Sequence, residues 1–152
     1  MVFLRSYRQG DEEEIQALVR DVLKEYGLKT NPQVTDRDIQ DIDAWYVLNR
    51  GVFKVLEDEG RIVGSYGIFT VSDTVCELRK MYVLDKYRGQ GLGARLMEDA
   101  LHEAKALGYD VIILETNSRL MEACSLYRSY GFQEFKPDHL SDRCDIAMRI
   151  VL

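Results

Sequence analysis

The sequence predicts an α/β (α+β) fold in a single domain, residues 1–152, with a mixed but mostly antiparallel central sheet. Three observations predict it. Apolar residues follow strand and helix periodicities in turn along the chain. A turn signal at residues 58–60 lies between two β-rich runs and predicts an antiparallel hairpin. Helical patterns separate the later apolar runs, which implies crossover connections. Together they give about seven strands with helices on both faces.

The first third of the chain is typical of a strand followed by two helices. Residues 3–7 form the expected strand, and Asp11 is expected to cap a helix with an acidic first turn that ends near Gly27. The apolar stripe of that helix is Ile15, Leu18, Val19, Val22, Leu23 and Tyr26. A weaker helix is expected after the cap candidate Thr35. Its apolar positions are Ile39, Ile42, Trp45, Tyr46 and Leu48.

The remaining elements alternate between strands and helices. Residues 52–55 and 62–71 flank the hairpin turn, and residues 75–84 form the next strand. A helix from Gly91 to about Leu107 ends at Gly108. The continuous apolar run at 111–115 predicts a strand buried on both faces. A short helix at 119–130 ends at Gly131, and strands at 133–135 and 145–152 complete the sheet.

A glycine-rich turn joins the strand at 75–84 to the helix that follows. Such a turn at a helix N-terminus presents free backbone N–H groups and a favourable dipole to an anion. A nucleotide P-loop would need Lys-Ser or Lys-Thr after the glycines, and none is present. The dinucleotide fingerprint needs wider spacing than Gly89, Gly91 and Gly93 provide. A plain strand-to-helix turn remains the structural alternative.

Two motifs carry a resemblance to a known family. The turn reads Arg88-Gly89-Gln90-Gly91-Leu92-Gly93 and resembles the Arg/Gln-x-x-Gly-x-Gly/Ala motif of the GNAT superfamily of N-acetyltransferases. Residues 123–132 are similar to the segment Ala-x-x-Leu-Tyr-x-x-x-Gly-Phe of the same family. The order of the predicted elements also looks like that of the family. The resemblance therefore extends over nearly the whole chain.

The resemblance implies an acetyl-CoA-dependent enzyme. It would transfer acetyl to a primary amine of a small molecule or peptide, by direct attack in a ternary complex. The turn would bind the pyrophosphate and the preceding strand the pantetheine arm. The implied cofactor-binding residues are Met81, Tyr82, Val83, Arg88, Gly89, Gln90, Gly91, Leu92, Gly93, Ala94 and Asn117. A non-catalytic acyl-CoA-binding or sensor module with the same fold is the alternative.

The same resemblance assigns the two proton transfers. Tyr127 would be the general acid for the CoA thiolate, and Glu77 the general base for the amine. Each has a structural alternative: Tyr127 belongs to an apolar helical stripe, and Glu77 has basic neighbours in Arg79 and Lys80. Cys124 is interpreted as inert core rather than a nucleophile. For Asn117, a turn-forming role is the alternative to cofactor binding.

Composition and charge limit the other possibilities. A net charge of −6 argues against a nucleic-acid partner. The longest apolar runs are too short to span a membrane, and the first residues show no secretory signal, so a cytoplasmic location is expected. Three widely spaced cysteines are expected to be reduced. His102 and His139 have no metal-ligand partner at useful spacing, so no metal is expected. A homodimer is possible by resemblance to the family alone.

The acceptor is not identified by the sequence. In the resembling family its pocket draws on the first two helices and on the loop between the last strands. Here those regions contain Tyr26, Trp45, Tyr46 and the polar segment 138–143. Aromatic residues at these positions are equally compatible with a buried core.

Overall fold

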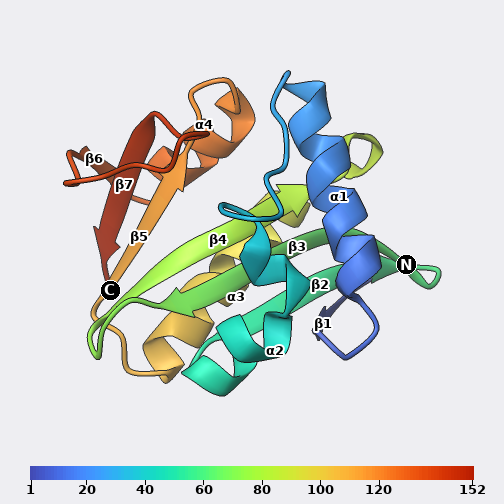
Figure 1. Ribbon diagram of the computed structural model, residues 1–152, viewed down its shortest axis with the longest axis horizontal. Coiled ribbons are helices and arrows are strands. Elements are labelled where there is room, and N and C mark those ends of the chain that lie inside the picture. The colour runs from blue at the N-terminus through green and yellow to red at the C-terminus, as the bar shows by residue number, and fades with distance from the viewer.

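Seven strands form one sheet, in the order β1-β2-β3-β4-β5-β7-β6 (Figure 1). The computed structural model describes residues 1–152. Every neighbouring pair is antiparallel except β4 and β5, which are parallel, so the expected mixed sheet is confirmed. The strands are β1 (Val2–Ser6), β2 (Val52–Asp58), β3 (Arg61–Thr70), β4 (Val75–Val83), β5 (Val111–Thr116), β6 (Gln133–Phe135) and β7 (Ile146–Val151).

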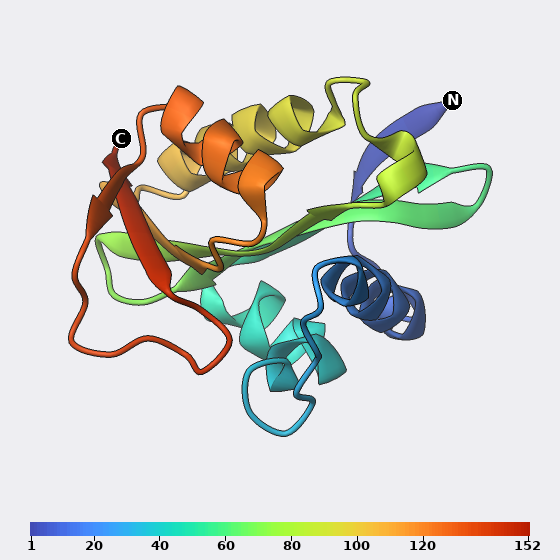
Figure 2. The same cartoon turned by 90° about the horizontal axis from the view of Figure 1, so that it is seen from above.

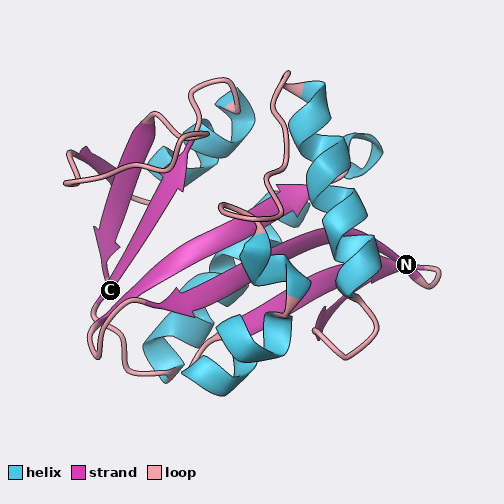
Figure 3. Ribbon diagram, in the orientation of Figure 1, coloured by secondary structure: helices cyan, strands magenta, loops and turns pink.

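Helices cover both faces of the sheet (Figures 2 and 3). The helices are α1 (Glu12–Glu25), α2 (Ile42–Trp45), α3 (Leu92–Ala106) and α4 (Met121–Ser129). Figure 2 shows α1 and α2 on one face and α3 and α4 on the other. No helix combines the length and the apolar character needed to cross a membrane.

The expected second helix after Thr35 is wrong as one continuous element. The structure divides it into a 3-10 turn at Arg37–Gln40, the single α-helical turn α2 and a second 3-10 turn at Val47–Asn49. Asp41 interrupts the first turn with an extended backbone and caps α2 by accepting a hydrogen bond from the Ala44 amide at 3.1 Å. The bent path buries Ile39, Ile42 and Tyr46 together but leaves Leu48 81% exposed.

Two further sequence expectations are corrected. Asp11 stands at the N-terminus of α1 but makes no capping hydrogen bond, because its carboxylate accepts hydrogen bonds from Arg5 and from the Arg8 amide. The strand β5 is not buried on both faces. Its residues alternate between buried and half-buried, with Ile113 and Glu115 on the more open face. That face borders a cavity rather than a helix.

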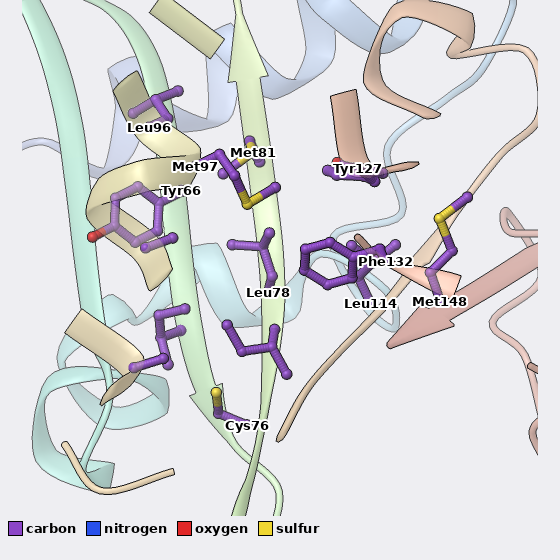
Figure 4. Packing of buried hydrophobic residues seen from close by; sticks show 14 of the residues in the cluster. Tyr66, Cys76, Leu78, Met81, Leu96, Met97, Leu114, Tyr127, Phe132 and Met148 are labelled. Atoms are coloured by element: carbon purple, nitrogen blue, oxygen red, sulfur yellow. The ribbon is translucent and has the colours of Figure 1, made fainter. Parts of the chain in front are cut away.

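Two apolar clusters lie on either side of the sheet. The larger packs β3, β4 and β5 against α3 and α4, and Figure 4 shows Leu78, Met97, Leu114 and Tyr127 within it. The smaller packs β2 and β3 against α1 and α2. Each helix buries one apolar stripe, so the sheet is enclosed as the periodicity predicts.

The parallel strands β4 and β5 separate after a short pairing. They are in register only from Val75 to Glu77 on β4 and from Val111 to Ile113 on β5. Beyond this point β5 pairs only with β7, and the two strands diverge in Figure 1. A bulge lies at the same place, because Lys80 has a φ of 55° and the pairing with β3 shifts between Ser65 and Gly67. Ser65 stabilises the bulge by donating to the Lys80 carbonyl at 2.7 Å.

Candidate active site

Two cavities meet at the gap between β4 and β5. The smaller, of about 250 Å³, is enclosed by the glycine turn, α4 and the C-terminal end of α1. The larger, of about 670 Å³, is lined by the open face of the gap, by the loop before β7 and by Val34, Thr35, Arg37 and Asp38. Four residues line both: Met81, Tyr82, Leu120 and Tyr127. A ligand in one cavity therefore meets a ligand in the other at these side chains.

The glycine turn offers a run of free hydrogen-bond donors. None of the six backbone N–H groups from Gly89 to Ala94 donates a hydrogen bond within the protein. The first helical bond runs from the Arg95 amide to the Gly91 carbonyl at 3.0 Å. The first turn of α3 also has no acidic side chain to oppose an anion. Free donors and the positive end of the helix dipole together form an anion-binding site.

Two glycines keep this turn open. Gly89 and Gly91 have φ values of 75° and 77°, a region that residues with a Cβ rarely adopt. A Cβ built on either would meet nothing within 4 Å, so the space over the amides is free. Gly93 differs, because its Cβ would lie 3.3 Å from the Leu126 side chain. Its role includes the packing of α3 against α4.

The free edge of β4 supplies backbone groups on the other side of the small cavity. The Leu84 amide donates to the Val63 carbonyl on β3 at 2.9 Å. Because successive residues of a strand point to opposite edges, the amides of Val83 and Met81 face away from β3, toward the gap. The structure thus brings the backbone of the predicted pantetheine residues Met81, Tyr82 and Val83 to the cavity wall.

Arg88 lines the small cavity, but the protein engages both its side chain and its amide. The amide donates to the Asp85 carbonyl at 3.1 Å. The guanidinium forms two hydrogen bonds with Glu25, at 2.7 and 3.1 Å, and one with the Val83 carbonyl at 3.0 Å. It therefore connects α1 to the end of β4 and fixes the wall of the cavity. A direct contact with the cofactor stays a prediction, as it does for Gln90 and Ala94, which lie outside the cavity lining.

Tyr127 lies at the junction of the cavities. Its side chain is buried, and its hydroxyl forms no hydrogen bond with the protein. Burial raises the pKa of Tyr127, so the phenol is protonated at neutral pH. The apolar stripe expected from the sequence is present in part, because Leu120 and Cys124 are buried with Tyr127 while Tyr130 is half-buried. The Tyr127 ring also packs against Phe132 at a centroid distance of 5.9 Å. Packing and an available hydroxyl coexist in this residue.

Glu77 lines the large cavity beside Arg79. Its Oε1 accepts a hydrogen bond from Arg79 Nε at 2.6 Å, so the ion pair considered from the sequence is formed. Burial raises the pKa of Glu77, and the Arg79 charge opposes that increase. The carboxylate thus has both a partner and a pKa moved toward neutral pH, which suits a general base.

Other predicted residues have structural roles or different places. Asn117 holds the loop after β5, donating to the Arg143 carbonyl at 2.8 Å and accepting from the Arg119 amide at 2.9 Å, so cofactor binding by it stays a prediction. Of the candidate acceptor residues, Trp45 and the segment 139–143 line the large cavity, except Leu140. Tyr46 is fully buried, and Tyr26 lines the small cavity instead.

Sequence reasoning missed a buried ionic cluster under the large cavity. Asp36 accepts two hydrogen bonds from Arg143, at 2.6 and 2.8 Å, and lies 3.2 Å from Lys80 Nζ. Asp38 is 3.2 Å from the same ammonium group and accepts a hydrogen bond from the Tyr46 hydroxyl. These residues come from distant segments and form no local motif. Only the unusual backbone at Lys80 marks the place, and it cannot be seen in the sequence.

The cavities contain no cluster of three or more His, Cys, Asp or Glu side chains arranged to hold a metal ion.

The chain resembles known proteins over most of its length. The sequence model of the acetyltransferase (GNAT) family matches residues 16–132. The uncharacterized N-acetyltransferase YjgM of Escherichia coli K12 is 34% identical over 135 residues, which cover 86% of this chain and 81% of the relative.

Solved structures show the same fold. A GNAT-family acetyltransferase from Staphylococcus aureus Mu50 superposes with a TM-score of 0.93 at 22% identity, covering 99% of both chains. The PaiA N-acetyltransferase of Thermoplasma acidophilum, solved in complex with coenzyme A, superposes with a TM-score of 0.74 at 16% identity, covering 100% of this chain and 99% of that one. The family match and the identity to YjgM establish the conclusion: this chain belongs to the GNAT family and is an acetyltransferase.

Proposed function

We propose that this enzyme transfers the acetyl group of acetyl-CoA to a primary amine by direct attack in a ternary complex. One observation carries the proposal: Tyr127 lies where a cavity beside six free amides opens into a second, charged cavity. Family membership supports acyl-CoA as the cosubstrate. The coenzyme A complex of a protein with the same fold adds support.

The residues of the small cavity fit coenzyme A. A pyrophosphate is an acceptor for the free amides of residues 89–94, and the open space over Gly89 and Gly91 admits it. The outward-facing amides of Met81 and Val83 match the carbonyls of a pantetheine arm laid along β4 as an added strand. Bound acetyl-CoA supplies the thioester that the amine attacks.

Glu77 is the proposed base for the incoming amine. An alkylamine has a pKa near 10.4, roughly that of lysine, so it arrives as an ammonium ion and must lose a proton. Glu77 lines the cavity proposed for the acceptor, and burial brings its pKa closer to neutral pH. A water molecule between the amine and the carboxylate serves the same transfer.

Tyr127 is the proposed acid for the departing sulfur. Its hydroxyl has no partner in the protein, so its proton is available at the junction. The raised pKa of Tyr127 makes the phenol a weaker acid, so transfer requires that the thiol pKa rise as well. Burial has this effect on thiols in the same molecule, since it raises the pKa of Cys76 to about 12.

An acyl-enzyme on cysteine has less support than direct attack. The thiols near the cavities belong to Cys124 and Cys144, and burial raises the pKa of both. Neither is therefore a thiolate at neutral pH, which a cysteine nucleophile requires. The Cys124 thiol is also directed to the Asn117 carbonyl at 3.7 Å.

A test of the function combines an acceptor panel with one variant. Coenzyme A release is measured with amino acids, polyamines, aminoglycosides and short peptides. Tyr127→Phe is expected to lower kcat by about 10²-fold or more, with little change in acetyl-CoA affinity. Tyr130→Phe, at the C-terminal cap of the same helix, is the control, because its hydroxyl bonds to Glu98 outside both cavities. If acetyl-CoA binds but no amine releases coenzyme A, the protein is an acyl-CoA sensor instead.

A further inference from the structure

The lining of the large cavity balances positive and negative charge. Its carboxylates belong to Asp38, Glu77, Glu115 and Asp142, and its cations to Arg37, Arg79, Lys80 and Arg143. A cavity built for a polyamine would need an excess of carboxylates, because each additional ammonium group requires a negative partner when it leaves water. A balanced lining instead fits an acceptor that carries one charge of each sign.

Arg79 presents the positive half of such a site. Its Nε is bound to Glu77, and its guanidinium stacks on the Phe69 ring at 3.8 Å. Its two terminal nitrogens donate no hydrogen bond within the protein, and 27% of the side chain is exposed toward the cavity. The edge formed by two terminal guanidinium nitrogens binds a carboxylate with two parallel hydrogen bonds. Stacking and the ion pair hold this edge in place before any ligand arrives.

Two carboxylates with unused acceptor capacity line the same cavity as Arg79. Glu77 uses only one oxygen in its bond to Arg79. Glu115 has no cationic partner and accepts only the Ser141 amide at 2.9 Å. Asp38 also lines the cavity, but its Oδ1 already lies 3.2 Å from Lys80 Nζ, so Glu77 and Glu115 are the carboxylates left for a ligand. An ammonium group is the ligand that supplies donors to such oxygens.

We infer that the acceptor is a free α-amino acid, whose carboxylate binds Arg79 while its amino group lies beside Glu77. This inference rests on the proposed acetyl transfer and names its substrate class. An α-amino acid carries its ammonium and carboxylate groups on one carbon, and Glu77 and Arg79 carry the opposite charges side by side on one strand. A peptide N-terminus or a polyamine lacks the adjacent carboxylate and leaves the Arg79 edge without a partner.

The group transfer balances with these residues. The ammonium group gives one proton to Glu77, and the nitrogen forms a bond to the acetyl carbon as the bond from that carbon to sulfur breaks. The amide nitrogen releases its second proton to water, and the sulfur takes a proton from Tyr127. The products are an N-acetyl amino acid and coenzyme A. Tyr127 recovers its proton from solvent, and Glu77 loses one to it.

The test compares matched acceptors on the intact enzyme. Coenzyme A release is measured with the proteinogenic L-amino acids, with the decarboxylated amine of each where one exists, and with spermidine. For at least one amino acid, kcat/KM should exceed that of its decarboxylated amine by about 10- to 100-fold, the usual contribution of hydrogen bonds between charged groups. Equal or better turnover of the decarboxylated amine or of spermidine would overturn the inference.

Variants of Arg79 test whether this side chain causes the preference for an amino acid over its decarboxylated amine. Arg79→Gln should raise KM for the amino acid at least tenfold and remove most of its advantage over the decarboxylated amine, without changing acetyl-CoA affinity. Arg79→Lys keeps the charge but loses the two-nitrogen edge, and should retain only part of the advantage. If Arg79→Gln does not fold, Arg79→Lys alone serves as the test variant. Arg8→Gln is the control, because Arg8 is exposed at the surface beside Glu57. An unchanged preference in both Arg79 variants would overturn the inference.

A binding measurement distinguishes a failure of this inference from a failure of the proposed catalysis. Calorimetry with coenzyme A present measures the affinity of the same amino acids without turnover. If no amine releases coenzyme A but an amino acid binds in an Arg79-dependent manner, the catalytic proposal fails and the ligand assignment stands. If no amino acid binds and none is acetylated, the assignment itself is overturned.

Discussion

The two cavities that meet at Tyr127 are built in different ways. The glycine turn consists of consecutive residues and acts through backbone amides, so its chemistry is independent of most side chains. The large cavity depends on charged side chains from segments far apart, such as Asp36 and Arg143, which are 107 residues apart in sequence. A backbone site can serve one invariant ligand, whereas a side-chain site can change its ligand with a few substitutions. The difference predicts that variants of the two regions affect different substrates.

The largest expected effect is a loss of stability when the ionic cluster under the large cavity loses a carboxylate. Asp36→Ala leaves Arg143 without its buried carboxylate and Lys80 with Asp38 alone, and should lower the free energy of unfolding by about 3–5 kcal/mol, measured by urea denaturation. Glu134→Ala, which breaks the exposed pair with Arg128, should cost less than about 1 kcal/mol. A loss from Asp36→Ala no larger than that of the control would show that the cluster does not hold the cavity together.

The next effect tests the proposed base. Glu77→Gln should lower kcat/KM by about 10²-fold at neutral pH and recover in part as the pH approaches the pKa of the amine, because fewer protons then need removal. Glu115→Gln is the matched variant, since Glu115 lines the same cavity but is bonded to the Ser141 amide. A larger loss in the Glu115 variant would transfer the role of base to that residue.

A smaller effect is expected at the glycine turn. Gly91→Val should weaken acetyl-CoA binding at least about tenfold, because the valine side chain fills the space over the amides. The preference among acceptors should be unchanged. Gly60→Val matches it closely, since Gly60 has a φ of 80° and equally open surroundings in the β2–β3 hairpin. Both variants carry similar backbone strain, so calorimetry isolates the effect on the cofactor. Equal affinity in the two variants would contradict the site.

The smallest effect is a shift in pH dependence. The Arg79 charge lowers the pKa of Glu77, while burial raises it. Removal of that charge in Arg79→Gln therefore raises the Glu77 pKa further, and the base is ionised only at higher pH. The acidic limb of the kcat/KM profile should move to higher pH, measured with a decarboxylated amine so that carboxylate binding does not contribute. A shift to lower pH would exclude Glu77 as the group that titrates.

The sequence predicted the sheet and the turn because both are encoded locally. A strand was predicted at the place of each of the seven, from apolar runs and turn signals, and Gly89 and Gly91 indicated a backbone that departs from ordinary geometry. The second helix was predicted wrongly, because its path depends on burial of Tyr46 and on the extended Asp41, which periodicity alone does not reveal. The ionic cluster under the large cavity was missed for a related reason. A charged residue is predicted to lie at the surface unless its partner, here from a distant segment, is known.

The two cavities also differ in how far along the chain their residues extend. The residues that line the small cavity all lie between positions 22 and 127, so the ribosome makes them before it reaches Arg143. Neither cavity is closed by local contacts, because the Tyr26 hydroxyl and Glu122, which both line the small cavity, are 96 residues apart. The large cavity differs in needing a wall from residues 139–144, which the small cavity does not use. A chain shortened before that segment would keep every residue of the cofactor cavity and lose one wall of the cavity for the amine.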